Sequence, residues 1–199
     1  MLENGDVNIE LTAAAGTDGE EITARLFSDG GYRVVNVARN RGFQGRGIDL
    51  LCYKEDGGAE KETKVEVKTD GRMWRTGNLF CETKIERPDA RIQPGWLLTS
   101  QMQVLVYNDA RNGIGYFFDF QLLKDYALQN ERMFRDVTAP DPYDPGSRCC
   151  GILLPLFRVI RDIPQCLIEY HVIPELEEIR FPDRFSGTMV SETKRGEGP

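Results

Sequence analysis

The sequence contains little of what several classes of enzyme and membrane protein require. His171 is the only histidine, so a Ser-His-Asp hydrolase would depend on it, yet no nucleophile-elbow motif is present. No apolar run approaches the roughly 20 residues of a membrane span, and the acidic start MLENGDVNIE is unlike a signal peptide. There is no GxxxxGK[ST] loop, and residues 42–47, GFQGRG, lack nucleotide-binding spacing. These absences argue against a serine hydrolase, a membrane protein and a P-loop enzyme.

Zinc-binding patterns are also missing. The chain has five cysteines but no CxxC pair and no Cys/His spacing typical of zinc. An odd count with two adjacent cysteines indicates reduced thiols, as expected in the cytoplasm. The cysteines are Cys52, Cys81, Cys149, Cys150 and Cys166.

Acidic residues outnumber basic ones, 32 to 25. The formal net charge is −7, which argues against broad nucleic-acid binding by the whole surface but allows a basic groove. With 199 residues, 40% of them hydrophobic, we expect a single domain over residues 1–199 that has a real core.

The stretch GRGIDLLCYKEDGGAEKETKVEVKTD predicts a β-hairpin. We expect strands over residues 48–54 and 62–69, joined by a turn at 55–60 that contains Gly57-Gly58. A turn centred on that glycine pair fixes the register of the two strands.

This register predicts a cluster of charged side chains. Because side chains alternate along a strand, Val65 and Val67 face one way, while Glu66 and Lys68 face the other. Asp49 then lies opposite Glu66, with Cβ atoms roughly 5 Å apart, a distance at which like charges destabilise a sheet. Two carboxylates so close together indicate a cation between them.

Asp49 followed by Glu66-Val67-Lys68 resembles the PD-(D/E)xK nuclease superfamily, which includes many restriction enzymes and archaeal Holliday-junction resolvases. The sequence departs from the name-giving pattern because Ile48 stands where proline would. The resemblance covers about residues 16–130. It implies an α/β fold of the restriction-endonuclease type, a mixed β-sheet core flanked by helices, here with an added C-terminal region.

The first helix is expected to begin near Thr17 or Asp18, which are good N-caps. Ala24 and Phe27 then form its apolar face. Glu20 precedes them by four and seven residues, so it lies on the same inward face.

The superfamily commonly carries a glutamate on this helix that helps to hold the metal, and Glu20 matches it by position. Glu21 is the alternative. In a third interpretation both glutamates merely favour the helix N-terminus through its dipole.

The resemblance implies Mg²⁺ (or Mn²⁺) held by Asp49, Glu66 and Glu20, with the backbone carbonyl of Val67 as a further ligand. Lys68 would orient or deprotonate the attacking water, or stabilise developing charge. The implied catalytic residues are thus Glu20, Asp49, Glu66 and Lys68.

Two basic segments are candidates for nucleic-acid contact. Arg39, Arg41 and Arg46 either hold backbone phosphates or belong to a solvated loop. Arg72 and Arg75 flank Trp74 in a loop where an exposed tryptophan would stack on a base and a buried one would belong to the core.

The remaining pattern completes the expected elements. Glu82, in a strand over residues 78–85, is either a further acid of the site or an edge-strand charge. Residues 7–11 predict a short strand or an arm. Further strands are expected at 32–38, 104–107 and 114–120, a turn marked by Asn108-Asp109 and Asn112-Gly113, a helix at 121–131, loops at 87–96 and 139–147, and a strand or helix at 150–160. The core at about 16–130 would precede a C-terminal extension at 131–186 and a disordered tail at 187–199.

Together these features predict a metal-dependent nuclease that hydrolyses phosphodiester bonds, with DNA as the expected substrate. The alternative is a nuclease-like fold that has lost catalysis and binds nucleic acid or a protein partner. A homodimer is compatible with the sequence, which leaves the oligomeric state open.

Overall fold

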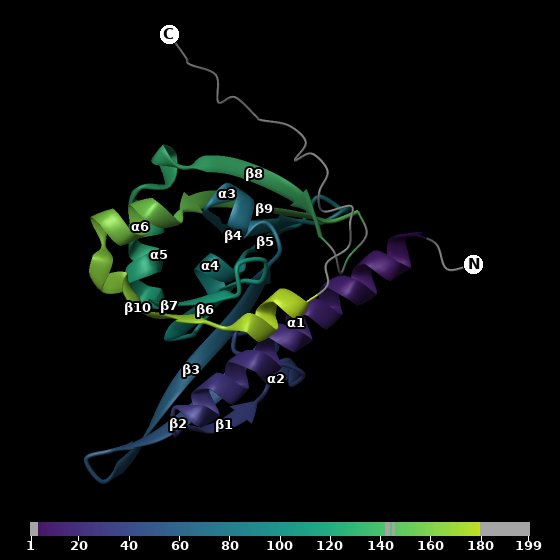
Figure 1. The fold of residues 1–199 in the computed structure, drawn as a ribbon. Helices are drawn as coiled ribbons and strands as arrows, with labels where there is room; N and C mark the ends of the chain where they lie inside the picture. The colour runs from purple at the N-terminus through teal and green to yellow at the C-terminus, as the bar shows by residue number, and fades with distance from the viewer. Residues whose placement is uncertain (1–3, 142–143, 145, 180–199) are drawn as a thin grey trace.

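The computed structural model describes residues 4–141, 144 and 146–179, and for residues 4–13 it describes the helical backbone alone. The expected tail at 187–199 lies outside these residues. Two sheets and several helices form a mixed α/β fold (Figure 1). None of the helices in the described ranges has the length and apolar character needed to cross a membrane.

The central sheet has six strands in the order β1-β2-β3-β6-β7-β10. Its β3–β6 pair is parallel and its other neighbouring pairs are antiparallel, so the sheet is mixed as expected. The strands are β1 (Arg33–Asn36), β2 (Leu50–Asp56), β3 (Ala59–Asp70), β6 (Val104–Asp109), β7 (Ile114–Asp119) and β10 (Leu167–Val172).

A second, antiparallel sheet has four strands in the order β5-β4-β9-β8. It comprises β4 (Asn78–Glu86), β5 (Ile92–Pro94), β8 (Arg135–Pro140) and β9 (Arg148–Pro155). The strand expected at 78–85 is therefore present, and it belongs to this second sheet. The region expected as a C-terminal extension supplies strands to both sheets.

Six α-helices connect or cover these strands within the described ranges. They are α1 (Asn4–Asp29), α2 (Arg41–Gln44), α3 (Met73–Thr76), α4 (Trp96–Thr99), α5 (Phe120–Gln129) and α6 (Leu156–Asp162). Short 3₁₀ turns occupy Glu131–Met133, Pro164–Cys166 and Pro174–Glu178.

The β2–β3 hairpin has the predicted register. Pairs run from Leu50↔Val65 to Asp56↔Ala59, which centres the turn on Gly57-Gly58. Both glycines have positive φ, +61° and +87°, as a tight two-residue hairpin turn requires. The strands consequently continue closer to the tip than expected.

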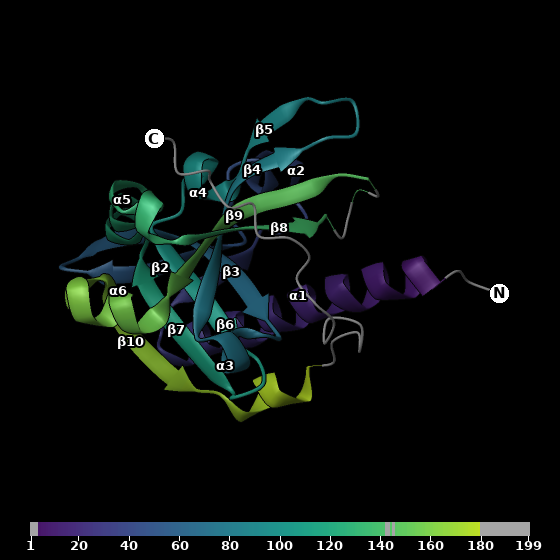
Figure 2. The same ribbon diagram turned by 90° about the horizontal axis from the view of Figure 1, so that it is seen from above.

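One hydrophobic core fills the space between helix α1 and the central sheet. Val65 and Val67 face this core, where Ala24 and Phe27 of α1 pack against them. Figure 2 shows α1 running beside the strands of this sheet. The predicted packing of the first helix on one face of a mixed sheet is confirmed.

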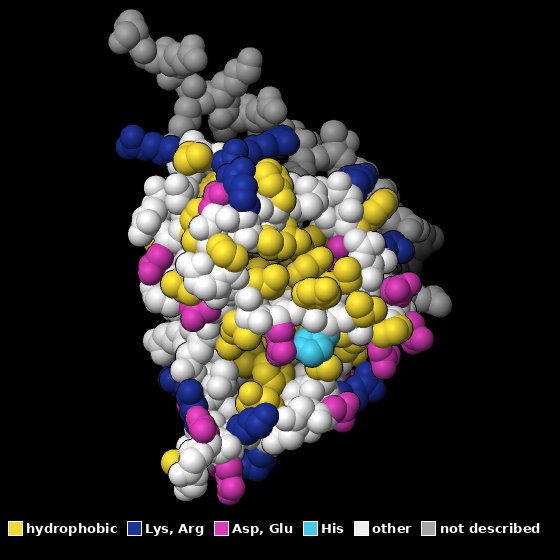
Figure 3. Space-filling model, turned by 60° about the vertical axis from the view of Figure 1, so that its left-hand side comes forward, with side chains coloured by type: hydrophobic (Ala, Val, Ile, Leu, Met, Phe, Trp, Pro, Cys, Tyr) yellow, Lys and Arg dark blue, Asp and Glu magenta, His cyan; other side chains and the backbone are white. Residues whose placement is uncertain are grey.

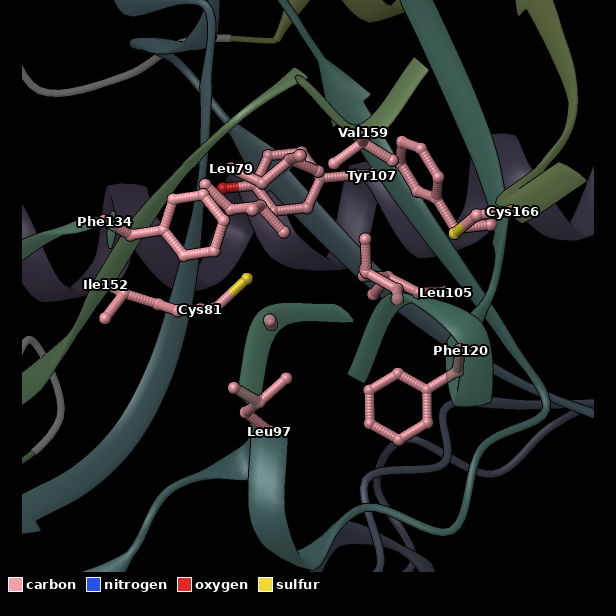
Figure 4. Close-up of a cluster of buried hydrophobic side chains, with 14 of the residues drawn as sticks. Leu79, Cys81, Leu97, Leu105, Tyr107, Phe120, Phe134, Ile152, Val159 and Cys166 are labelled. Carbon is pink, nitrogen blue, oxygen red and sulfur yellow. The ribbon is translucent and has the colours of Figure 1, made fainter. Parts of the chain in front are cut away.

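A larger core lies between the two sheets (Figure 4). Leu79 and Cys81 of β4 meet Leu105 of β6 there, and helices α4 and α5 close the core with Leu97 and Phe120. All five cysteines are free and buried, as the reduced-thiol prediction requires.

The single histidine belongs to a packing contact on β10. The His171 ring meets the Phe117 ring edge-on at 5.2 Å, and its Nε2 lies 3.3 Å from a carboxylate oxygen of Glu169. In Figure 3 the histidine lies on the surface with an acidic side chain directly beside it and hydrophobic side chains nearby. Tyr170 and Val172, on the same strand, are exposed apolar residues.

Several expected boundaries were wrong. Helix α1 begins at Asn4, not at Thr17 or Asp18, and residues 7–11 are helical, not a strand or arm. The alanines at 13–15 are strong helix formers, so the helix continues N-terminally in spite of its three glycines. Potential capping residues do not start a helix where the preceding residues are themselves helical.

The turn expected from Asn108-Asp109 and Asn112-Gly113 is present at residues 110–113, although Asn108 and Asp109 themselves belong to β6. The Asn108 amide is buried and donates to Thr23 Oγ1, and Asp109 accepts from the Asn112 backbone. Asp109 is thus held by the turn that follows it, whereas Asn108 contacts helix α1. The loop expected at 87–96 contains the short strand β5.

Gly19 allows α1 to approach β3 closely. A Cβ at this position would lie 1.9 Å from Thr69 Oγ1, whereas one at Gly16 on the same helix would meet nothing within 4 Å. Either glycine-to-alanine change gains helix propensity of about 0.5–1 kcal/mol. Only the change at position 19 forces neighbouring atoms apart.

We therefore expect Gly16→Ala to raise the free energy of unfolding by about 0.5–1 kcal/mol. Gly19→Ala should lower it by about 1–3 kcal/mol, the typical cost of overpacking. Urea denaturation of the two variants measures both values. Equal stabilisation by both changes would contradict the close approach of helix and sheet.

Candidate active site

Strand β3 supplies an ion pair at the centre of the candidate site. Glu66 is only 5% exposed, and its Oε1 contacts the Lys68 ammonium. Its other oxygen, Oε2, is buried without a hydrogen-bond partner in the described part of the chain. A buried carboxylate oxygen without a partner is costly, so this atom is a candidate ligand position.

Asp49 lies where the β2–β3 ladder ends. Its backbone N–H donates to Val65 O at 2.9 Å, and its Oδ2 accepts from the Val67 N–H at 2.8 Å. Burial, together with the nearby Glu66 carboxylate, raises the pKa of Asp49 to about 7. The predicted closeness of the two carboxylates is therefore evident in their electrostatics.

The positive charge of Lys68 partly balances the negative charges of Glu66 and Asp49. Burial alone would favour the neutral amine, but the charges of Glu66 and Asp49 outweigh it and raise the pKa of Lys68 above its ordinary value. Lys68 is consequently an ammonium ion at neutral pH. Its Nζ also lies 5.9 Å from the centre of the Trp96 ring.

Helix α1 brings Glu20 to the same cluster. Burial raises the pKa of Glu20, the Lys68 charge lowers it, and the Glu66 charge raises it again. A hydrogen bond from the Asn36 side chain also acts on this carboxylate. Glu21 is exposed, so of the two glutamates only Glu20 is placed toward the cluster.

Glu82 is a further acid near Lys68. Strand β4 lies between β5 and β9, so the edge-strand interpretation of this residue was wrong. Its Oε1 accepts from the Trp96 N–H at 3.3 Å, and its charge contributes to the raised pKa of Lys68. The alternation of side chains along β4 indicates this placement from sequence, because it puts Glu82 and Phe80 on the face opposite Leu79.

The cluster opens into a cleft with a volume of about 1670 Å³. Glu20, Asp49, Lys68 and Glu82 all line it. Residues of both sheets and of helix α1 thus share one large concave surface.

The basic residues predicted to contact nucleic acid divide into two groups. Arg72, Trp74 and Arg75 line the cleft, and Trp74 is 53% exposed, the condition set for a stacking residue. Arg41 and Arg46 are exposed in and beside α2 and are not among the lining residues.

Arg39 and Arg46 have identifiable local contacts. The charge of Arg39 acts on Glu20. Arg46 Nε donates to Gly42 O at 2.8 Å, and its guanidinium covers the Phe43 ring at 4.9 Å. The structure therefore leaves both interpretations of this loop open to experiment.

Ser100 lies beside the acidic cluster and was not predicted as a site residue. A Cβ at Gly47 would lie 2.1 Å from Ser100 Oγ and 3.4 Å from Glu66 Oε2, and Gly47 has a φ of +58°. Within the described residues, Ser100 Oγ is buried without a hydrogen-bond partner, like Glu66 Oε2. Only glycine leaves room for both oxygens at this point.

The donor atoms suit a hard divalent cation. Carboxylate and carbonyl oxygens are the ligands that Mg²⁺ and Mn²⁺ take, and Glu66 Oε2 is an oxygen in need of a partner. As the side chains of the described residues lie, no three acidic, histidine or cysteine groups are close enough together to hold a metal. Cation binding therefore requires movement of at least one side chain, and Lys68 now contacts the oxygen beside the orphaned one.

The raised pKa of Asp49 predicts pH-dependent stability. In the folded protein Asp49 holds its proton up to about pH 7, whereas its ordinary pKa is 3.8. Between these values the folded state binds more protons than the unfolded state, so its stability falls as pH rises. Asn at position 49 keeps an acceptor for Val67 N–H and removes the titration.

We therefore expect metal-free Asp49→Asn to be more stable than wild type at pH 8, by on the order of 1 kcal/mol, and the gap to shrink at pH 5. Urea denaturation at both pH values measures it. Asp56→Asn, at the exposed hairpin tip, is the matched control and should not change the wild-type pH dependence. A variant at position 49 that is less stable than wild type at pH 8 would contradict the electrostatic description.

Comparisons with known proteins were made on the whole chain. No family model matches it, and no curated protein matches it. Among solved structures, it is similar to a bacterial homing endonuclease, with 18% sequence identity and a TM-score of 0.42, over 58% of this chain and 73% of that chain. At that identity and TM-score the likeness carries no argument about chemistry, for which the side chains described above are the evidence.

Proposed function

We propose that this protein is a divalent-metal-dependent nuclease that hydrolyses phosphodiester bonds, with DNA as the expected substrate. One observation carries the proposal. Asp49 and Lys68 line one cleft with Glu20, and Glu66, which contacts Lys68, has a buried oxygen without a partner among the described residues. Carboxylates brought this close together lower the stability of the folded protein. A bound cation offsets this cost, so the cluster is best explained by a cation site.

The carboxylates of Asp49, Glu66 and Glu20, with the carbonyl of Val67, would hold the cation. When bound, Mg²⁺ or Mn²⁺ supplies Lewis acidity toward the phosphate and lowers the pKa of bound water. The hydrogen bond from Val67 N–H to Asp49 Oδ2 fixes one carboxylate in place at 2.8 Å. This bond leaves the other Asp49 oxygen to act as a ligand.

Lys68 would act on the phosphate or on the attacking water. Its raised pKa makes it a hydrogen-bond donor and a positive charge at neutral pH. An ammonium here stabilises negative charge that develops on the phosphate oxygens in the transition state. Trp96, beside Lys68, restricts the directions in which this side chain can point.

The cleft itself suits a chain-like substrate. Its volume of about 1670 Å³ exceeds that of an ordinary small-molecule pocket, roughly 300–1,000 Å³. Arg75 and Arg111 line it and would contact the phosphates that flank the scissile bond.

The first prediction concerns metal-induced stabilisation and cleavage. Mg²⁺ or Mn²⁺ at about 100 times its Kd should stabilise the wild type by about 2.7 kcal/mol, or roughly 5–10 °C in Tm. Asp49→Asn should lose most of this shift, and its cleavage of plasmid and single-stranded DNA should fall by more than about 100-fold, because a ligand is lost. Lys68→Ala should lose cleavage but keep most of the shift, because lysine is not a ligand.

Lys61→Ala, on the exposed part of the same strand, is the matched control and should cleave like wild type. A full metal shift in Asp49→Asn would place the ion elsewhere. A wild type that binds DNA but cleaves none of these substrates with either metal would establish the binding-module alternative.

The second prediction concerns salt. Each phosphate contact adds about 0.7–0.9 to the slope of log K against log salt. Replacing Arg75 and Arg111 together by alanine should therefore flatten the slope by about 1.4–1.8. An unchanged slope would remove both arginines from the binding surface.

Arg41→Ala with Arg46→Ala, measured in the same titration, decides between the two interpretations of the basic loop. A flatter slope assigns phosphate contacts to these arginines, and a wild-type slope makes the loop a solvated one.

A further inference from the structure

Trp74 points to the kind of nucleic acid that the cleft takes. We propose that Trp74 stacks on an unpaired base, so that the protein selects single-stranded or splayed segments over intact duplex. The inference deepens the proposed function by naming the substrate class of the same cleft. It concerns binding, so it can be tested without cleavage.

The exposure of Trp74 is the first observation. Its side chain is 53% exposed at a cleft that Lys68 and Asp49 also line. Trp96, the other tryptophan, is half-buried and packs on Phe120. A large indole left in solvent beside charged groups is typical of a contact residue, because its flat apolar surface is stabilised only when a partner covers it.

The second observation is that the indole stands on an anchored turn. Met73, next to Trp74 in α3, is only 2% exposed and belongs to the core between the sheets. Asp70 Oδ1 accepts from the backbone N–H groups of Arg72 and Met73, at 2.6 and 3.2 Å.

The same carboxylate is held from its other side. Asp70 Oδ2 accepts from the hydroxyl of buried Tyr107 at 2.8 Å, and that hydroxyl accepts from Phe80 N–H. The backbone that carries Trp74 is therefore fixed to both sheets. A partner that covers the indole loses little free energy in ordering the turn, which is how rigid aromatic anchors give affinity.

Charge in the cleft decides what kind of partner it is. The basic residues that line the cleft are outnumbered by the acidic ones, six to five, and the whole chain carries −7. The basic lining residues are Lys68, Arg72, Arg75, Arg87 and Arg111. The acidic lining residues are Glu20, Asp49, Asp70, Glu82, Asp141 and Asp144. A duplex, bound chiefly through its phosphates, gains little from such a surface in the absence of metal.

Stacking is the attraction that remains. A base face is worth about 1–3 kcal/mol against an aromatic side chain and is insensitive to base identity. Within a duplex both faces of each internal base are covered by neighbouring bases, and the end pairs are held by pairing and by stacking on one face. An unpaired or splayed base is therefore the form that is open to Trp74. The cleft residues thus favour a strand with unpaired bases, with its phosphate directed toward Lys68.

The test is binding in a chelating buffer, where cleavage is absent. Three fluorescently labelled DNAs serve as probes: a single strand of about 12 nucleotides, a blunt two-stranded duplex of the same composition, and that duplex with a single-stranded flap. Trp74→Ala should weaken binding of the single strand and the flap by about 5- to 150-fold and that of the duplex by less than 2-fold. Phe157→Ala removes an aromatic side chain of similar exposure, 62%, outside the cleft lining and should leave all three affinities unchanged.

A second measurement keeps the result separate from misfolding. The chain has two tryptophans, so Trp96→Phe leaves Trp74 as the only indole. Its fluorescence should be quenched by the single strand and remain unchanged with the blunt duplex. Trp74→Phe, which keeps a ring for stacking, should recover much of the affinity that alanine loses.

Equal loss of affinity for all three probes, no loss for any of them, or no quenching of Trp74 would overturn the inference. Its failure differs from failure of the proposed function. A wild type that cuts DNA with metal while Trp74→Ala keeps full strand preference refutes only the stacking. A wild type that stacks single strands through Trp74 but never cuts refutes only the nuclease.

Discussion

The charge balance around Lys68 is the interaction on which the site depends. Two carboxylates from the hairpin, one from helix α1 and one from β4 approach a single ammonium ion. Without that positive charge, their desolvation and mutual repulsion would oppose folding. Lys68 offsets only part of the desolvation and repulsion that act on Asp49, so the pKa of Asp49 is raised to about 7. A second cation would offset the carboxylate repulsion that Lys68 does not neutralise.

The scaffold makes this strain tolerable by packing on both sides of the central sheet. Val65 and Val67 lie in the core under α1, while their neighbours Glu66 and Lys68 face the second sheet. Burial of the two valines fixes the position of β3 against the core. The alternating residues Glu66 and Lys68 are therefore held on the opposite face of the strand. The buried apolar face of β3 thereby positions the charged side chains on the opposite face of the same strand.

The local parts of this arrangement were predictable from sequence. Alternation and a glycine pair gave the hairpin, its register and the facing of Glu66 and Lys68, because strand geometry links neighbours at fixed spacing. Glu20 followed from helical spacing to Ala24 and Phe27, even though the helix start was wrong. These inferences needed only short-range periodicity.

The second sheet and what it brings were not predictable in this way. Glu82 was a candidate acid from sequence, but its position near Lys68 depends on the pairing of β4 with β9, some 70 residues later. Ser100 lies beside Glu66 because Gly47 leaves room there. No periodicity encodes such pairings between distant segments. The N-terminal extent of α1 escaped prediction for a related reason, since capping residues were weighed without the continuous helix around them.

The wide separation of the site residues along the chain has a consequence for folding. Helix α1, the hairpin and β4 must all dock before residues 20, 49, 66 and 82 stand together. Contacts between distant segments form late, because the entropy of closing long loops is lost before the contacts are gained. A nascent or partly folded chain therefore carries the same acidic residues without the constellation they form. The completed cleft is therefore a property of the folded protein.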